Sequence, residues 1–179
     1  MKKFTQISGV IGKSKKFNQE LHNKFDSNAR EIIKDKIPKY VIDNPNIYGE
    51  DLIINCNGLP YDFIEVQVCG TWIDKYPYIY PFIYARKMRF SDKTLFITFN
   101  ADYTKIIMFS KKAIINKPVR MKKYGKEYIY YVDNNKYIEV SVNNFNLSLI
   151  KIYAGINVNS DSDSDSDNLT SNTFSKNVN

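Results

Sequence analysis

The sequence contains little histidine and cysteine, the residues that build most zinc sites and disulfide frameworks. Its 179 residues include one histidine, His22, and two cysteines, Cys56 and Cys69. Two cysteines cannot form the set of bridges that holds small secreted domains together, and the sequence has no His/Cys cluster for zinc. A single histidine can act as a general base, but His22 has no nucleophile or metal ligand near it in the sequence. We therefore interpret it as a surface or packing residue.

Long apolar runs are also missing. The first residues, Met1–Gln6, lack an apolar segment of signal-peptide length. Nowhere does an apolar run reach the roughly 20 residues that a membrane-spanning helix needs. The sequence therefore predicts a soluble intracellular protein of the cytoplasm or nucleus, neither secreted nor embedded in a membrane.

The residues that are abundant indicate a folded, basic domain. Apolar residues make up 43% of the chain and aromatic residues 15%, enough for one domain with a real core. The net charge is +7, and residues 159–179 carry four Asp and one Lys, so the rest of the chain carries +10. A body this basic favours a polyanionic partner. The charge has two alternative origins: lysine-rich surfaces also serve solubility alone, and a composition rich in Lys and Asn resembles that of AT-rich genomes such as those of giant DNA viruses.

Composition divides the chain into three parts. We expect a basic N-terminal arm over residues 1–25, a globular domain over residues 26–156 and a disordered acidic tail over residues 157–179. The tail holds a Ser-Asp repeat, residues 160–167, without apolar side chains whose burial would offset the entropy of ordering.

A β-hairpin is predicted at the centre of the globular domain. Residues 51–55 and 61–68 are rich in β-branched and aromatic side chains, and the sequence Asn-Gly-Leu-Pro at residues 57–60 is typical of a turn. Strand side chains alternate between the two faces of a sheet. Glu65 and Gln67 therefore share one face of the second strand, and the apolar residues between them lie on the other.

Two carboxylates on this hairpin can hold a divalent metal ion. Asp51 opens the first strand and Glu65 lies on the second, so both can meet at the rim of the sheet. Hard cations such as Mg²⁺ or Mn²⁺ take oxygen ligands and keep several waters, so two carboxylates, a backbone carbonyl and a substrate phosphate are enough. This arrangement is typical of a phosphodiesterase.

At these residues the chain resembles the PD-(D/E)XK nuclease superfamily, whose motif is an Asp, a short hairpin and then (D/E)-x-K on the next strand. The matching positions within residues 26–110 are Asp51 and Glu65-Val66-Gln67, with Gln67 where the family usually has Lys. The resemblance implies an α/β (α+β) fold like that of restriction endonucleases, with a mixed central sheet flanked by helices. It also implies metal-dependent hydrolysis of phosphodiester bonds in DNA or RNA, with Mg²⁺ or Mn²⁺ held by Asp51 and Glu65.

Gln67 leaves three hypotheses open, because a neutral amide cannot supply the charge attributed to the family's Lys. In the first, Lys87, on a helix predicted over residues 78–90, substitutes for that Lys, and Gln67 or Lys87 orients the attacking water. In the second, the protein is a catalytically inactive nuclease fold that binds nucleic acid or a protein partner. In the third, it has no nucleic-acid role and Asp51 and Glu65 are ordinary polar residues of a hairpin.

A third metal ligand is suggested by the same resemblance. Families of this kind often add a Glu from the preceding helix, and Glu31 lies in a helix predicted over residues 28–36, which Pro38 stops. The alternative is that Glu31 is an ordinary residue of a helix surface.

Further strands are predicted around the hairpin, some in the central sheet and two in an additional C-terminal hairpin. A short strand over residues 40–42 would precede the hairpin, and a second, C-terminal hairpin would add two more strands. The predicted segments are residues 94–99 and 105–109, the hairpin strands 127–132 and 137–140, and a last strand or short amphipathic element over residues 145–153.

The predicted contacts with nucleic acid are basic side chains at the end of the helix over residues 78–90 and in residues 111–126. They are Arg86, Arg89, Lys111, Lys112, Arg120, Lys122 and Lys123. Each contact with a phosphate adds to the salt dependence of binding. The alternatives are that the first two stabilise a helix end and that the others belong to a solvated loop or to an edge strand protected by lysines. The sequence leaves a homodimer open.

Overall fold

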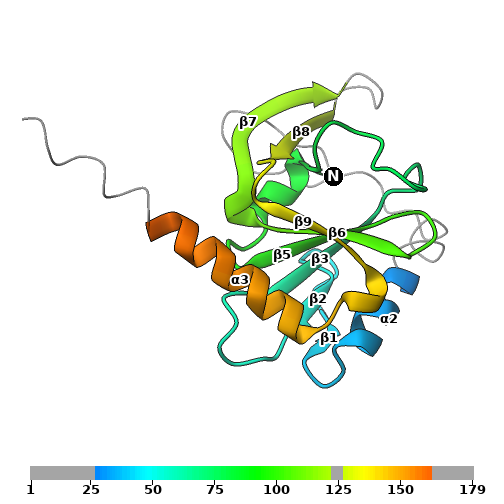
Figure 1. Ribbon diagram of the computed structural model, residues 1–179, viewed down its shortest axis with the longest axis vertical. Coiled ribbons are helices and arrows are strands. Elements are labelled where there is room, and N and C mark those ends of the chain that lie inside the picture. The colour runs from blue at the N-terminus through cyan, green and yellow to red at the C-terminus, as the bar shows by residue number, and fades with distance from the viewer. Residues whose placement is uncertain (1–26, 122–126, 163–179) are drawn as a thin grey trace, which may run out of the picture.

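The computed structural model describes residues 27–121 and 127–162, with side chains described as far as residue 155. These residues form three layers, in which a six-stranded sheet lies between two helices and a three-stranded sheet. Figure 1 shows the small sheet on one side of the main sheet and the helices on the other. A mixed α+β class is therefore confirmed.

The main sheet has the strand order β1-β2-β3-β5-β6-β9 and the small sheet the order β4-β8-β7. The strands of the main sheet are β1 (Val41–Asp43), β2 (Leu52–Ile54), β3 (Phe63–Val68), β5 (Thr94–Phe99), β6 (Lys105–Ser110) and β9 (Tyr137–Ser141). Those of the small sheet are β4 (Phe82–Tyr84), β7 (Ile114–Met121) and β8 (Glu127–Val132). The helices are α2 (Ser27–Lys36) and α3 (Leu147–Ser162), with 3-10 turns at η2 (Ala85–Arg89), η3 (Lys111–Ala113) and η5 (Val142–Asn144).

Strand β3 lies at the centre of the topology. It pairs antiparallel with β2, which confirms the predicted hairpin, and parallel with β5, with Glu65 opposite Phe96. Every other pair of neighbours in the main sheet is antiparallel. The parallel pair requires a crossover from one end of the sheet to the other, and residues 69–93, here called the crossover segment, supply it.

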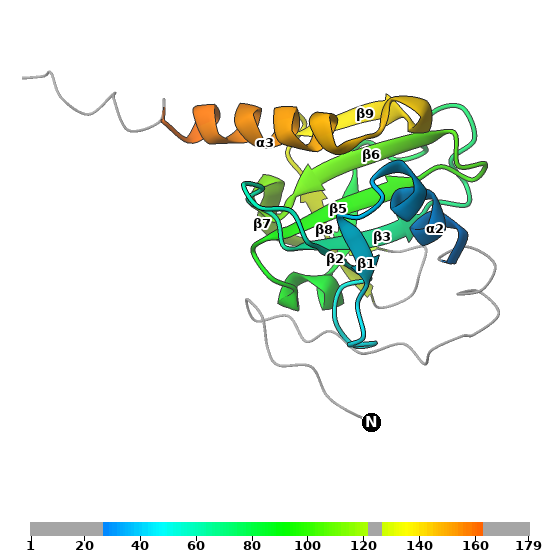
Figure 2. The ribbon, with the colours of Figure 1, turned by 90° about the horizontal axis from the view of Figure 1, so that it is seen from below.

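The predicted alternation of β3 decides which side chains enter the core. Ile64 and Val66 are buried together with Ile33 of α2 and Ile150 of α3, so both helices cover the same face of the main sheet. Figure 2 shows the molecule from the helix side. Because a strand places alternate residues on opposite faces, Glu65 lies on the other face, toward the small sheet.

The space between the two sheets forms a second core. Phe96 of β5 and Phe109 of β6 stack with their ring centroids 5.4 Å apart. Trp72 of the crossover segment and Tyr130 of β8 are fully buried in the same cluster. Glu65 therefore lies on a face that the crossover segment and the small sheet cover.

The helix predicted over residues 78–90 is wrong. Phe82–Tyr84 form strand β4, which pairs with β8, and Ala85–Arg89 form the short turn η2. The spacing of three and four between apolar residues resembled a helix face, but the aromatic and β-branched residues before Ala85 favour a strand when a partner strand is available. Lys87 consequently lies on a 3-10 turn.

The predicted C-terminal hairpin is also wrong. Strands β8 and β9 both form, but β8 pairs with β4 and β7 in the small sheet, whereas β9 pairs with β6 in the main sheet. A short turn connects two strands without requiring them to pair, and each strand here pairs with a strand other than its neighbour in the chain. The hairpin in this part of the chain is β7–β8.

The last predicted element is helical. Helix α3 begins after Asn146, whose side-chain oxygen accepts a hydrogen bond from the backbone N–H of Leu149 at 3.0 Å. This is the geometry of a helix N-cap. The helix runs to Ser162, whereas residues 1–25 and the greater part of the predicted tail lie outside the described residues. Within the described part of the chain, no helix has the length and apolar character needed to cross a bilayer.

Candidate active site

The hairpin brings the Asp51 carboxylate to strand β3. Asp51 directly precedes β2, and its Oδ2 accepts a hydrogen bond from the backbone N–H of Val66 at 2.8 Å. This bond ties the start of one strand to the middle of the next. The side chain of Asp51 is thereby held beside Glu65, the neighbour of Val66 in the chain.

Glu65 forms an ion pair with Lys87. The Lys87 Nζ lies 2.7 Å from the Glu65 Oε1, and the two side chains are 12% and 8% exposed. The structure therefore brings together Asp51, Glu65 and Lys87, three of the four predicted catalytic residues. Burial of this kind strengthens the interactions among their charges, because less water screens them.

Burial raises the pKa of Glu65 to about 8, well above the ordinary value of a glutamate. The nearby ammonium of Lys87 acts in the opposite direction, whereas the carboxylates of Asp51 and Glu50 add to the rise. A protonated Glu65 can still accept a hydrogen bond from Lys87. The site thus concentrates negative charge that a proton, a lysine or a metal ion can neutralise.

This pKa predicts how stability depends on pH. Between about pH 5 and pH 8 the folded protein keeps a proton on Glu65 that the unfolded chain has released, so the contribution of Glu65 to stability falls as pH rises. We expect Glu65→Gln, which has no such proton to lose, to gain about 2–4 kcal/mol relative to the parent across this window. Urea unfolding at several pH values in EDTA measures the difference. Parallel pH profiles for the two proteins would contradict the prediction.

Gln67 lies on the same face of β3, two residues after Glu65. Its side chain is half-buried, and within the described residues it has no hydrogen-bond partner. The amide oxygen is therefore available to a metal ion, a water molecule or a phosphate, although the amide adds no charge.

Glu31 does not join these residues. Its side chain is 64% exposed, and its carboxylate pairs with Lys34 at 2.7 Å on the surface of α2. Among residues 27–121 and 127–162, no group of three His, Cys, Asp or Glu side chains is placed to hold a metal ion. Glu31 therefore fits the alternative in which it is an ordinary residue of a helix surface. A metal ion at this site would have only the carboxylates of Asp51 and Glu65 as charged ligands.

Two residues that the sequence patterns did not indicate lie against the site. Arg30 of α2 places its Nη1 3.9 Å from the Oδ1 of Asp51. Glu50 is buried, and its Oε1 accepts hydrogen bonds from the N–H of Ser91 at 2.8 Å and from the Oγ1 of Thr94 at 2.9 Å. The only feature of the sequence that could have indicated Glu50 is its position directly before Asp51. Nothing in the sequence around Arg30 indicates that it lies near the site.

Four of the predicted nucleic-acid contacts have partners within the protein, and two of the four are arginines. Arg86 lies over the ring of Tyr84 and pairs with Glu127. Arg89 donates a hydrogen bond to the backbone oxygen of Tyr48 at 2.5 Å. These two arginines hold parts of the fold together, and a phosphate would have to compete with those partners.

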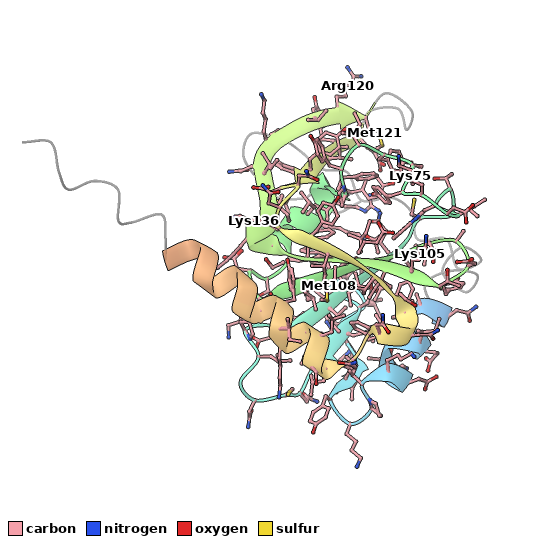
Figure 3. All side chains as sticks on the ribbon, viewed as in Figure 1. Lys75, Lys105, Met108, Arg120, Met121 and Lys136 are labelled. Atoms are coloured by element: carbon pink, nitrogen blue, oxygen red, sulfur yellow. The ribbon has the colours of Figure 1, made fainter. Side chains whose placement is uncertain are left out.

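Lys111 also has partners within the protein. The other predicted contacts lie elsewhere on the surface or outside the described residues. Lys111 pairs with Asp92 at 2.9 Å and donates to the backbone oxygen of Phe90. Lys112 is exposed but also has a partner, and Arg120 projects from the end of β7 (Figure 3). Strand β7 is an edge strand of the small sheet, which agrees with the edge-strand alternative. Lys122 and Lys123 lie outside the described residues.

Comparison with known proteins gives no relative for this chain. It matches no protein-family model, and neither a search of curated proteins nor a search of solved structures finds a similar one.

Proposed function

We propose that this protein is a metal-dependent nuclease that hydrolyses phosphodiester bonds of DNA or RNA, with its active site at Asp51, Glu65 and Lys87. The observation that carries the proposal is the 2.7 Å contact between the Lys87 Nζ and Glu65. The PD-(D/E)XK motif places a lysine two residues after the acid on the same strand. Here a lysine from η2 reaches that acid from another part of the chain.

The order of elements supports this proposal. The superfamily core has three strands between two helices, with the Asp and the acid on the second and third strands. In this chain α2 is followed by the antiparallel strands β1, β2 and β3, with Asp51 at the start of β2 and Glu65 on β3. The second helix has no equivalent here, since β4 and η2 take its place in the crossover segment.

The donor set suits a hard divalent cation. The carboxylates of Asp51 and Glu65 and the amide oxygen of Gln67 would hold Mg²⁺ or Mn²⁺, all through oxygen. Such an ion lowers the pKa of a bound water and stabilises charge on the scissile phosphate. Lys87 would then donate to the attacking water or to a phosphate oxygen, and Arg30 would offset the negative charge near Asp51.

The test is cleavage of supercoiled plasmid and of labelled single-stranded DNA and RNA by the full chain. We expect cleavage in Mg²⁺ or Mn²⁺ and none in EDTA, with the activity lost in an Asp51→Asn protein purified in parallel. A folded parent protein that binds nucleic acid but cuts none of these substrates in either metal would refute the proposal.

A second candidate is a nucleic-acid-binding protein that keeps the fold without the chemistry. The neutral Gln67 favours it, and so does the basic edge strand β7, on which Lys117 and Arg120 are exposed. This candidate would show affinity that falls with salt but no metal-dependent cleavage.

Both candidates predict the same effect for the charges on β7. Removing them in Lys117→Ser/Arg120→Ser should lower the slope of log affinity against log salt by about 2, because each phosphate contact releases about one counterion. Fluorescence anisotropy with a labelled oligonucleotide at several salt concentrations measures the slope. Lys151→Ser, on the exposed surface of α3, is the control that should leave the slope unchanged. If the slope is the same in the double variant and in the control, β7 does not contact the nucleic acid.

A further inference from the structure

Glu50 is a buried carboxylate that the proposed chemistry does not use. Only 8% of the residue is exposed, although it lies at the end of the loop that connects β1 with β2. Burying a carboxylate is costly unless hydrogen bonds replace its water. The partners of Glu50 therefore indicate what the residue does.

Both partners lie where the crossover segment ends and β5 begins. The Glu50 Oε1 accepts from the N–H of Ser91 and from the hydroxyl of Thr94, residues that follow it by 41 and 44 positions. Thr94 is fully buried and opens β5. One carboxylate oxygen thus fixes the point at which the chain leaves η2 and enters the main sheet.

Three further contacts hold the same stretch. Arg89, the last residue of η2, donates to the backbone oxygen of Tyr48, two residues before Glu50. On the other side, Lys111 donates to the oxygen of Phe90 and pairs with Asp92. The residues that follow Lys87 are therefore tied both to the loop before β2 and to the turn after β6.

These ties matter because η2 adds no fully buried side chain to the core, and only Ala85 and Met88 pack against the second core. It is a 3-10 turn of five residues, none of them buried, that ends with a hydrogen bond from the N–H of Phe90 to the oxygen of Lys87. Short 3-10 turns have poorer hydrogen-bond geometry than α-helices. The position of Lys87 consequently depends on what anchors the ends of the turn.

We propose that Glu50 is a positioning residue, which anchors the crossover segment next to Asp51 and thereby places the Lys87 Nζ on Glu65. The catalytic importance of this role rests on the proposed function, whereas the placement of Lys87 does not. Glu50 and Asp51 are neighbours in the chain, so a single segment would set the positions of both the metal-binding carboxylate and the lysine.

The direct test measures how readily Lys87 is acetylated by limiting acetic anhydride, with mass spectrometry of peptides from the folded full chain. In the parent, Lys87 should react more slowly than the exposed Lys151. Glu50→Ala should raise the rate at Lys87 at least about fivefold without changing Lys151, because the turn loses its anchor. Glu65→Ala is the positive control, since it removes the oxygen that Lys87 contacts.

Two more variants separate positioning from other roles. Glu50→Gln keeps an oxygen that can accept both hydrogen bonds, so it should restore most of the protection of Lys87. Thr94→Val removes one donor without touching any carboxylate, and it should raise the rate at Lys87 by a smaller factor than Glu50→Ala. It also serves as the test if Glu50→Ala does not fold. Unchanged protection of Lys87 in folded Glu50→Ala and Thr94→Val, or an equal rise at Lys87 and Lys151, would overturn the inference.

The labelling result and the proposed function can fail separately. If the parent cuts nucleic acid, Glu50→Ala should lower kcat about 10- to 100-fold with little change in KM, because the substrate contacts on β7 remain. An equal loss in Glu50→Gln would overturn positioning in favour of a direct role in metal binding. If the parent does not cut, the proposed function fails, while exposure of Lys87 in Glu50→Ala still establishes the anchor.

Discussion

Replacing Asp51 with Asn is expected to lower the rate of metal-dependent cleavage by at least about a thousandfold, a loss of about 4 kcal/mol of transition-state stabilisation. The Asn side chain keeps an oxygen that can accept the hydrogen bond from Val66, which is 2.8 Å long in the parent. The hairpin should therefore stay intact, while a metal ion at the proposed site would lose one of its two negatively charged ligands. Single-turnover cleavage of a labelled oligonucleotide in saturating Mg²⁺ measures the rate.

A matched control is available on the same sheet. Asp43→Asn also neutralises an aspartate, but Asp43 lies at the exposed end of β1 and pairs with Lys34 at 2.8 Å. We expect cleavage by this variant within about twofold of the parent, since an exposed ion pair contributes little. Equal rates for Asp51→Asn and Asp43→Asn, with both proteins folded, would show that Asp51 is not a metal ligand.

The second large effect concerns the lysine. Lys87→Met is expected to lower cleavage by about 10²- to 10³-fold, because it removes the only ammonium in contact with Glu65 among the described residues. Adding Gln67→Lys to this variant should recover at least about tenfold. Gln67 lies on the same face of β3 as Glu65, and a lysine there would restore the acid-x-lysine order of the PD-(D/E)XK motif.

The exchange has two internal controls. Lys93→Met removes an exposed lysine from the same crossover segment, where it pairs with Asp62, and should leave the rate nearly unchanged. Gln67→Lys alone would place two ammonium groups beside Glu65 and should not increase the rate. If the double variant binds nucleic acid normally but cuts no better than Lys87→Met, the position of the charge in the motif does not explain the role of Lys87.

The parts of the fold that sequence could predict are those set by neighbouring residues. Alternation along β3 and the Asn-Gly turn before it predicted the hairpin, and both strands are confirmed. The faces of β3 followed from the same alternation, so the opposite orientations of Val66 and Glu65 were predictable as well. Local pattern was sufficient here because a short turn leaves two adjacent strands few other ways to pair.

Elements whose partners are distant in the chain were mispredicted. The segment before η2 was taken for a helix because its partner strand, β8, begins more than 40 residues later. Strands β8 and β9 were paired with each other because nothing local shows that they belong to different sheets. In both cases tertiary pairing overrode a weak local preference.

In the candidate site, too, the residues that could be predicted are those whose partners are close in the chain. Asp51 and Glu65 could be predicted because one hairpin carries both of them. Lys87 was singled out as a substitute cation, although on the wrong kind of element, and the structure places it against Glu65. Glu50 and Arg30 could not be assigned, because their contacts cross long stretches of chain that carry no periodic signal.

The way in which the crossover segment is held has a consequence for how the protein is made. Strands β2 and β3 form a local hairpin, and β5 can join them once the intervening loop closes, but β4 has no partner until β8 has been synthesised. Long-range pairing of this kind forms late in folding. A growing chain that ends before β8 would thus carry both carboxylates, while the strand that leads into η2 still lacks its partner. If the protein is the nuclease proposed above, we expect its activity to begin only after β8, which ends at Val132, has been made and has paired with β4.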